Sequence, residues 1–156
     1  MSDSNINVKV KRMTSNSLAL PNYATAASAG VDLCADLKEP LVVMPGENIK
    51  IPTGLAIELP SQFVVALVFA RSGLASRFGM GLTNGVGVID SDYRGEIQVL
   101  VQNLGQQGVT INPGDRIAQM VFMPVFHALF EEVLELKDTP RGEGGFGSTG
   151  VEALTT

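Results

Sequence analysis

VIDSDYRGEI, residues 88–97, begins in a glycine-punctuated turn and leads into a strand. From Tyr93 to Val101, apolar or small residues alternate with polar ones, with Leu100 as the exception, which indicates a β-strand with one face in a core. Such a strand would hold the two carboxylates, the tyrosine and the arginine at its start in fixed positions. The pattern fits a ligand-binding hairpin that carries a catalytic carboxylate, and it also fits a hairpin with a solvated acidic tip.

Short apolar runs separated by turn residues continue through most of the chain. Residues 6–10 alternate between apolar and polar, which predicts a half-exposed strand, whereas residues 63–70 are apolar throughout, as in a strand buried on both faces. Pro45-Gly46 and Pro113-Gly114 mark turns between strands. Turn signals at intervals of roughly 8–12 residues predict an all-β sandwich, jelly roll or barrel.

Two segments have helical character. Residues 73–77 fit a single helical turn. Residues 125–137 are rich in helix formers, and Val125, Leu129, Val133 and Leu136 recur at helical spacing. This pattern alone predicts a helix over residues 125–137. The single histidine, His127, has no second histidine or cysteine to share a metal with, so we interpret it as a packing residue.

Composition limits the class of protein. A chain of 156 residues is long enough for one domain with its own core. The net charge of −5 argues against binding to a nucleic-acid backbone, and the apolar run at 63–70 is too short to span a membrane. The one cysteine, Cys34, cannot form an internal disulfide, and the polar N-terminus is not a signal peptide. We therefore expect a cytoplasmic protein with Cys34 in its core.

The chain changes character at residue 138. Residues 141–150 contain five glycines together with one arginine, one phenylalanine and two hydroxyl side chains. A glycine-rich segment can present main-chain N–H groups to an anion, and a phenylalanine outside the core can stack on a flat base. The segment is no Walker A loop, and a disordered tail is the alternative interpretation.

Three shorter segments set polar groups among apolar ones. Arg71 and Ser72 follow the buried run at a possible helix start, where phosphate is favoured. Asp32 lies between apolar neighbours and could be a magnesium-side ligand or a buried hydrogen-bond acceptor. Asp115 and Arg116 are interpreted as a salt bridge within a turn.

Five segments together resemble one family, the homotrimeric dUTP pyrophosphatases (dUTP diphosphatases). They are residues 29–33 (AGVDL), 70–75 (ARSGLA), 87–97 (GVIDSDYRGEI), 113–119 (PGDRIAQ) and 141–150 (RGEGGFGSTG). The resemblance implies an all-β, jelly-roll-like barrel or sandwich of the β-clip kind, with at most one short helix. It implies a β domain over 1–137 and a flexible glycine-rich arm over 138–156 that closes an active site, with a strand in place of the helix over 125–137. It also implies a homotrimer whose active sites are shared between subunits.

The resemblance also implies a role for each matching residue. Asp90 would be the catalytic carboxylate that deprotonates the attacking water, and Tyr93 would pack on the deoxyribose and exclude a 2′-hydroxyl. Asp32 would contact Mg²⁺ through water, the ion being held mainly by the triphosphate. The other implied substrate-binding residues are Arg71, Ser72, Gly73 and Gln119 at the phosphates, Asn84, Gly87, Val88 and Ile89 at uracil, and Arg141, Phe146, Gly147, Ser148 and Thr149 in the closing arm.

The implied reaction is Mg²⁺-assisted, in-line attack of water on the α-phosphorus of dUTP, which yields dUMP and pyrophosphate. It would limit uracil in DNA and supply dUMP for thymidylate synthesis, with no nucleic-acid or membrane partner. Gln98 stands where many relatives carry lysine, so no role is assigned to it. The alternatives are a dCTP deaminase-like nucleotide hydrolase and a nucleotide-sensing regulatory trimer.

Overall fold

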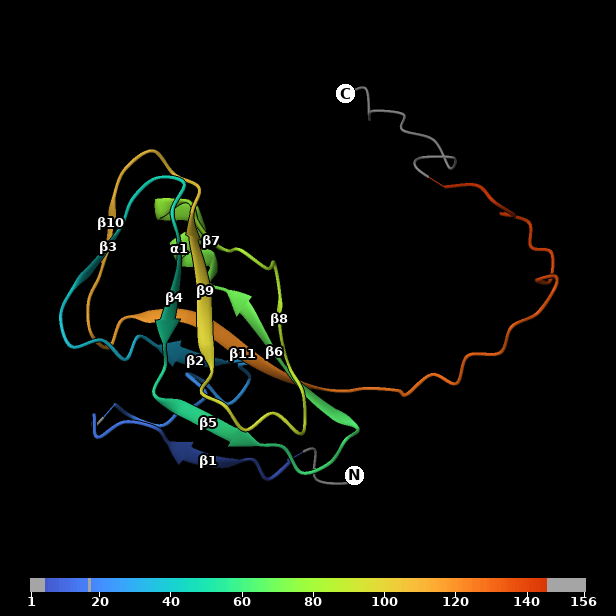
Figure 1. Cartoon of the computed structure of the whole chain (residues 1–156), viewed down its shortest axis with the longest axis horizontal. Helices are drawn as coiled ribbons and strands as arrows, with labels where there is room; N and C mark the ends of the chain where they lie inside the picture. The colour runs from blue at the N-terminus through green and yellow to red at the C-terminus, as the bar shows by residue number, and fades with distance from the viewer. Residues whose placement is uncertain (1–4, 17, 146–156) are drawn as a thin grey trace.

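The computed structural model describes residues 5–16 and 18–145, and its regular secondary structure consists almost entirely of antiparallel strands (Figure 1). The strands are β1 (Lys9–Arg12), β2 (Val31–Cys34), β3 (Leu41–Val43), β4 (Asn48–Pro52), β5 (Leu55–Glu58), β6 (Val64–Ala70), β7 (Met80–Leu82), β8 (Gly87–Ile89), β9 (Gln98–Asn103), β10 (Val109–Ile111) and β11 (Arg116–Pro124). Within the described residues there is one helix, α1 (Ser72–Phe78). The predicted all-β class with one short helix is therefore confirmed.

The central sheet carries the strands that position the candidate site. Its order is β2-β11-β6-β8, and β6 runs antiparallel to β11 from Val64 opposite Pro124 to Ala70 opposite Ala118. A second sheet has the order β4-β9-β7, and two pairs, β1-β5 and β10-β3, complete the fold. Strands distant in sequence thus become neighbours, as in a jelly roll.

The core lies between these sheets. Leu33 from β2 and Val68 from β6 belong to the same buried cluster as Ile51 from β4 and Val99 from β9. Burial of each such side chain contributes about 1.5–3 kcal/mol. On β6, however, only Val65, Ala66 and Val68 are buried, and the other four residues are partly exposed. The prediction that the whole strand is buried on both faces was therefore wrong.

Two strand predictions need correction. The strand expected from Tyr93 begins at Gln98, because residues 90–96 form a turn held by its own hydrogen bonds. All four residues of β1 are exposed, whereas a half-exposed strand was predicted. β1 pairs only with β5 and is therefore an edge strand. Cys34, expected in the core, is half-buried.

Helix α1 confirms the helical turn predicted for residues 73–77. It begins after Arg71, whose backbone is extended, and ends at Gly79. Gly79 adopts a left-handed conformation, with φ of 67°, and its N–H caps the carbonyls of Ala75 and Leu74. Such a glycine ends a helix at little steric cost.

Residues 125–137 form neither the helix that the pattern predicts nor the strand that the resemblance implies. They leave the body as an extended, exposed segment, drawn in orange in Figure 1. Phe126, Leu129 and Phe130 are each at least 98% exposed. A short amphipathic helix is not stable without a surface for its apolar face, and a strand needs a partner strand. The described residues of the chain supply neither to this segment.

The start of this segment is still attached to the body. Val125 donates a hydrogen bond to the carbonyl of Phe63, and the ring of His127 lies 5.4 Å from the ring of Phe63. His127 therefore packs against an aromatic side chain, in keeping with its interpretation as a packing residue. Among the described residues no helix has the length and apolar character needed to cross a membrane.

Candidate active site

Asp32 and two arginines form a charged cluster at one end of the central sheet. Arg71 Nε lies 2.9 Å from one carboxylate oxygen of Asp32, and Arg116 NH1 lies 3.2 Å from the other. Arg71 also donates a hydrogen bond to the main-chain carbonyl of Arg116, at 3.3 Å. The cluster has two positive charges and one negative charge, so it is locally cationic in a chain whose net charge is −5.

A β-bulge in β11 brings the polar residues of this strand to one face. The register against β2 shifts between Arg116 and Ala118, and the consecutive residues Ile117 and Ala118 are both buried. Arg116 and Gln119, three positions apart, consequently both avoid the core. Gln119 lies opposite Asp32 in the register, and its Nε2 donates to the carbonyl of Ala70 at 3.2 Å.

The pairing of Arg116 corrects a prediction. Asp115 does not pair with Arg116; its Oδ2 accepts hydrogen bonds from the N–H of Asn112, at 2.7 Å, and from the Asn112 side chain, at 3.2 Å. Arg116 pairs instead with Asp32, a residue 84 positions away. Sequence reasoning missed this contact because only the bulge turns Arg116 toward β2.

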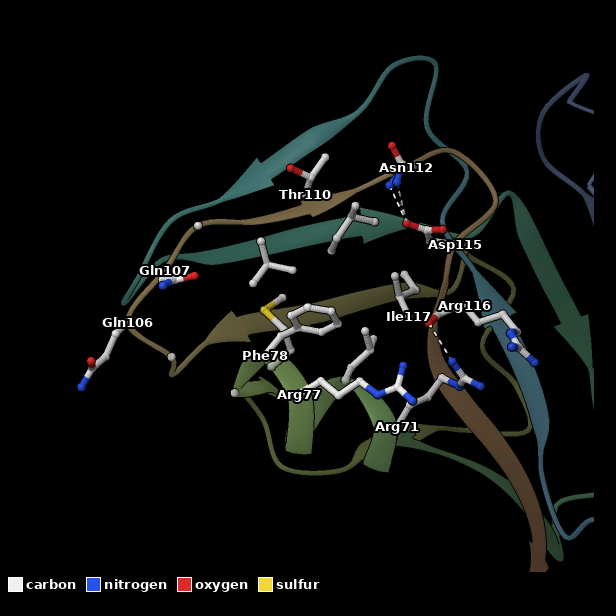
Figure 2. A pocket seen from close by; sticks show the side chains of 17 residues that line it. Arg71, Arg77, Phe78, Gln106, Gln107, Thr110, Asn112, Asp115, Arg116 and Ile117 are labelled. Atoms are coloured by element: carbon white, nitrogen blue, oxygen red, sulfur yellow. Dashed lines mark hydrogen bonds between the residues drawn. The ribbon is translucent and has the colours of Figure 1, made fainter.

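Arg71 and Arg116 line a cavity of about 880 Å³ between α1 and the segment from β10 to β11 (Figure 2). Arg77, from the last turn of α1, lines the same cavity. Ser72 and Gly73, in the first turn of α1, are exposed beside Arg71.

Burial, and to a smaller extent the neighbouring Asp32 carboxylate, raises the pKa of the Cys34 thiol above its usual value. The thiol therefore stays protonated at neutral pH, which disfavours a nucleophilic role for Cys34.

A second cluster lies on the turn between β8 and β9. Tyr93 N–H donates to the carbonyl of Asp90 at 3.2 Å, and the Tyr93 hydroxyl donates to the carbonyl of Glu96 at 3.1 Å. Arg94 NH1 donates to the carbonyls of Ser91, at 2.8 Å, and of Tyr93, at 2.9 Å. These bonds hold Asp90 and Tyr93 on an ordered turn, where both are exposed. The two residues line one small cavity, of about 230 Å³.

The glycine-rich turn before β8 lies next to this cluster in sequence. Gly85 has φ of 68°, and its N–H donates to the carbonyl of Leu82. A Cβ added to Gly87 would lie 3.2 Å from the Cβ of Val68 and 3.6 Å from the side-chain nitrogen of Asn84. Asn84 is thus beside Gly87, and residues 87–89 continue as β8 at the edge of the central sheet.

The two clusters are separate within one chain. Ile89 lies opposite Ala66 on β6, and Arg71 follows Ala66 by five residues. Because β8 runs antiparallel to β6, Asp90 lies one residue further from Arg71, so at about 3.3 Å per residue the two are roughly 20 Å apart along the strand. The cavities that contain them share no lining residue. The structure thus groups Asp32, Arg71 and Gln119 in one place and Asp90 and Tyr93 in another, while Asn84 lies beside Gly87, opposite Val68 on β6.

The predicted arm residues are only partly described. Arg141 lies in a turn at the end of the extended segment, where its Nε donates to the carbonyl of Gly144 at 2.9 Å. Phe146, Gly147, Ser148 and Thr149 lie outside the described residues.

A family model for dUTPase matches residues 16–150. The chain belongs to the dUTPase family. A deoxyuridine 5′-triphosphate nucleotidohydrolase of Desulfitobacterium hafniense is one of its relatives. The two sequences are 62% identical over 132 residues, which cover 85% of this chain and 87% of that protein. The family membership expected from the five segments is thereby confirmed.

Solved dUTPase structures have the same fold. The Staphylococcus bacteriophage 80alpha dUTPase with dUPNHPP superposes with a TM-score of 0.83 at 26% identity, covering 93% of this chain and 99% of that one. It belongs to the phage dUTPases described as controlling transfer of virulence genes by a G protein-like mechanism. A variant of the phage phi11 dUTPase of S. aureus, described as coordinating a structural Mg(II) ion, has a TM-score of 0.74 at 23% identity, covering 83% of this chain and 97% of that one. These likenesses confirm the predicted jelly-roll-like, dUTPase-like fold.

Proposed function

We propose that this chain hydrolyses dUTP to dUMP and pyrophosphate. The observation that carries the proposal is the family match over residues 16–150, which includes both charged clusters of the structure. One cluster supplies cations suited to a triphosphate, and the other supplies a carboxylate beside an aromatic ring. Hydrolysis of an anhydride by this set of groups depends on alignment and charge neutralisation.

The phosphate end of the substrate binds at Arg71, Ser72, Gly73 and Gln119. Supporting this is the geometry of Arg71, whose Nε contacts Asp32 Oδ1 and whose Nη1 donates to the carbonyl of Arg116, so that the guanidinium is held in place. A fixed guanidinium loses less side-chain entropy when it binds phosphate oxygens. The main-chain N–H groups of Ser72 and Gly73, in the first turn of α1, precede the helical hydrogen-bond pattern and can donate to the same oxygens.

Mg²⁺ would enter this site bound to the triphosphate. Within the described residues no group of three histidine, cysteine or acidic side chains could form a metal cage. Asp32 carries both its oxygens toward arginines, but each carboxylate oxygen can accept a further hydrogen bond from a metal-bound water. Asp32 would thus hold Mg²⁺ through water. When bound, Mg²⁺ neutralises phosphate charge and favours departure of pyrophosphate.

Asp90 acts as the general base. Its carboxylate is exposed at the start of the ordered turn, where it orients a water molecule in line with the α-phosphorus and accepts its proton. Tyr93, three residues later, packs on the deoxyribose and leaves no room for a 2′-hydroxyl. Asn84 and the main chain of Gly87, Val88 and Ile89 bind uracil. Supporting this grouping are the lining of one cavity by Asp90 and Tyr93 and the position of Asn84 beside Gly87.

The active sites are shared within a homotrimer. Two observations support shared sites: the phosphate cluster and Asp90 are roughly 20 Å apart along β6 in one chain, and residues 126–136 expose large apolar side chains that need a partner surface. Residues 1–137 form the β domain, and residues 138–156 form an arm that closes a site of a neighbouring subunit. In this arm Arg141, Gly147, Ser148 and Thr149 bind the γ-phosphate region and Phe146 stacks on uracil.

A direct assay tests the proposal. The protein is incubated with dUTP and Mg²⁺, and pyrophosphate and dUMP are quantified. Parallel incubation with dCTP and assay of ammonia distinguishes a deaminase-like reaction. Release of pyrophosphate from dUTP without ammonia from dCTP is expected. Tight dUTP binding with no turnover would favour a purely nucleotide-sensing role and would contradict the proposal.

A further inference from the structure

The ring of Tyr93 is folded back over the main chain of Gly95. A Cβ added to Gly95 would lie 2.3 Å from the Tyr93 hydroxyl oxygen, 2.5 Å from Cζ and 3.0 Å from Cε2. No real Cβ tolerates contacts this short, so the observed ring position requires a glycine at position 95. The hydroxyl then reaches the carbonyl of Glu96, at 3.1 Å.

Gly95 is required for space and not for backbone conformation. The glycines with positive φ include Gly54 and Gly85, but Gly95 is not among them. An alanine at position 95 could therefore adopt the same backbone angles without strain. The atoms that such an alanine would meet belong to the far end of one flexible side chain, so the Tyr93 ring, and not the fold, would have to move.

The acceptor side of this contact is fastened to the body of the protein. Glu96 Oε1 accepts a hydrogen bond from the N–H of Gly54 at 2.8 Å, and Ile97 N–H donates to the carbonyl of Leu55 at 2.8 Å. The Thr53 hydroxyl donates to the carbonyl of Ile97 at 2.7 Å. The Glu96 carbonyl thus sits on a segment tied to the β4–β5 turn, and the Tyr93 hydroxyl has a fixed partner.

We propose that Gly95 and Glu96 are positioning residues that set the orientation of the Tyr93 ring and thereby the discrimination between nucleotides with and without a 2′-hydroxyl. This inference rests on the proposed function for its kinetic consequence only. Gly95 leaves the space in which the ring lies, and Glu96 supplies the acceptor that holds the hydroxyl. A ring held in advance excludes a ribose hydroxyl more strictly than a ring free to turn aside.

The first test measures the ring directly, without turnover. The chain has two tyrosines and no tryptophan, so in a Tyr23→Phe background Tyr93 is the only tyrosine. Incorporated 3-fluorotyrosine then gives one fluorine resonance, from Tyr93. We expect Gly95→Ala to shift this resonance. Glu96→Ala keeps the main-chain carbonyl but removes the side-chain bond to the Gly54 N–H, so we expect it to shift or broaden the resonance. The matched control is Gly81→Ala, because a Cβ at Gly81 meets only the side chain of Leu104, at an ordinary 3.5 Å.

The second test is a double-mutant cycle on sugar discrimination. The ratio of kcat/KM for dUTP to kcat/KM for UTP is expected to fall by about tenfold or more in Gly95→Ala. In a Tyr93→Ala background the same Gly95→Ala change should have almost no further effect, since the ring it displaces is gone. Gly81→Ala should leave the ratio at its wild-type value.

The outcomes separate this inference from the proposed function. If wild-type protein does not turn over dUTP, the proposed function fails, and the fluorine resonance still tests the ring position. If the resonance and the ratio in Gly95→Ala both match wild type, the positioning role is wrong. It is equally wrong if Gly95→Ala lowers the ratio as much without Tyr93 as with it. Thermal unfolding of each variant checks that Gly95→Ala leaves the fold intact.

Discussion

At the scale of single residues, the candidate site depends on side chains that other groups of the protein hold in place. The carboxylate of Asp32 is bound by Arg71 and Arg116, and the hydroxyl of Tyr93 is bound by the carbonyl of Glu96. Such contacts fix a group before substrate arrives, so that binding energy is not spent on ordering it.

Asp90→Asn should keep the fold and dUTP binding and lose most turnover. The amide has nearly the same shape as the carboxylate but cannot accept the proton of the attacking water. Removal of a general base lowers a rate by about 10²–10⁴-fold. Single-turnover release of pyrophosphate measures the loss, and binding of a non-hydrolysable analogue is the control. Turnover near the wild-type level would remove Asp90 from the base role.

Arg116→Gln should lower kcat/KM for dUTP by about tenfold, because Asp32 then loses one of two cations and orients Arg71 less strictly. The unfolding midpoint should change little, since the Arg116 side chain is 56% exposed and such ion pairs contribute about 0–1 kcal/mol. Arg116→Lys is the matched variant, which keeps the charge and loses the planar fork, and it should recover part of the loss. Equal kcat/KM in all three proteins would contradict the prediction.

At the scale of the elements, the turns and the bulge bring the site residues together. The bulge in β11 places Arg116 and Gln119 on the side of Asp32, and the β4–β5 turn supports the loop that holds Tyr93. The β4–β5 turn contains Gly54, whose φ is 68°. A Cβ there would lie 2.4 Å from an oxygen of the buried Asp36, which is itself hydrogen-bonded by Thr14.

Gly54→Ala should therefore destabilise the fold more than a positive φ alone would. Gly46→Ala is the matched control, because Gly46 has φ of 78° and a Cβ there meets nothing within 4 Å. We expect a loss of about 1 kcal/mol in the control, from backbone strain, and of several kcal/mol at Gly54, from strain and displacement of Asp36 together. Urea unfolding measures both. Equal losses would show that the turn yields without disturbing Asp36.

At the scale of the whole molecule, one chain holds two separate polar clusters and a long exposed segment. The segment after β11 carries apolar side chains that no described part of the same chain covers. Such a surface is costly in water and is typical of a protein that associates. Assembly would therefore complete both the fold of this segment and the active site.

Deletion of residues 138–156 should leave folding intact and abolish most activity, because none of the described residues in this range belongs to the core. If the arm closes a neighbouring site, trimers re-formed from deleted chains and full-length Asp90→Asn chains should recover partial activity. Each recovered site combines an intact Asp90 with an intact arm from different chains. Verified mixed trimers without activity would contradict an arm that acts on a neighbouring subunit.

Much of this molecule could be predicted from its sequence, because the deciding interactions are local. Alternation of apolar and polar residues, with Gly and Pro at the turns, indicated the all-β class, and residues 73–77 indicated α1. The five motif segments indicated the family, since each keeps its residues at fixed spacing on one turn or strand end. Asp90 and Tyr93 are three residues apart, so their proximity on one turn was also within reach of the sequence.

Tertiary structure alone decided the contacts between distant segments. Arg116 pairs with Asp32 and not with its neighbour Asp115. The sequence did not predict this pairing, because a register shift in β11 cannot be read from residue types. From the sequence, Gly95 was interpreted as a small residue on the core face of a strand, and only the folded-back Tyr93 ring shows that its space is occupied. Residues 125–137 have the spacing of a helix and form none, because an apolar stripe becomes a helix only where a surface covers it, and no part of the chain within residues 5–16 and 18–145 covers this one.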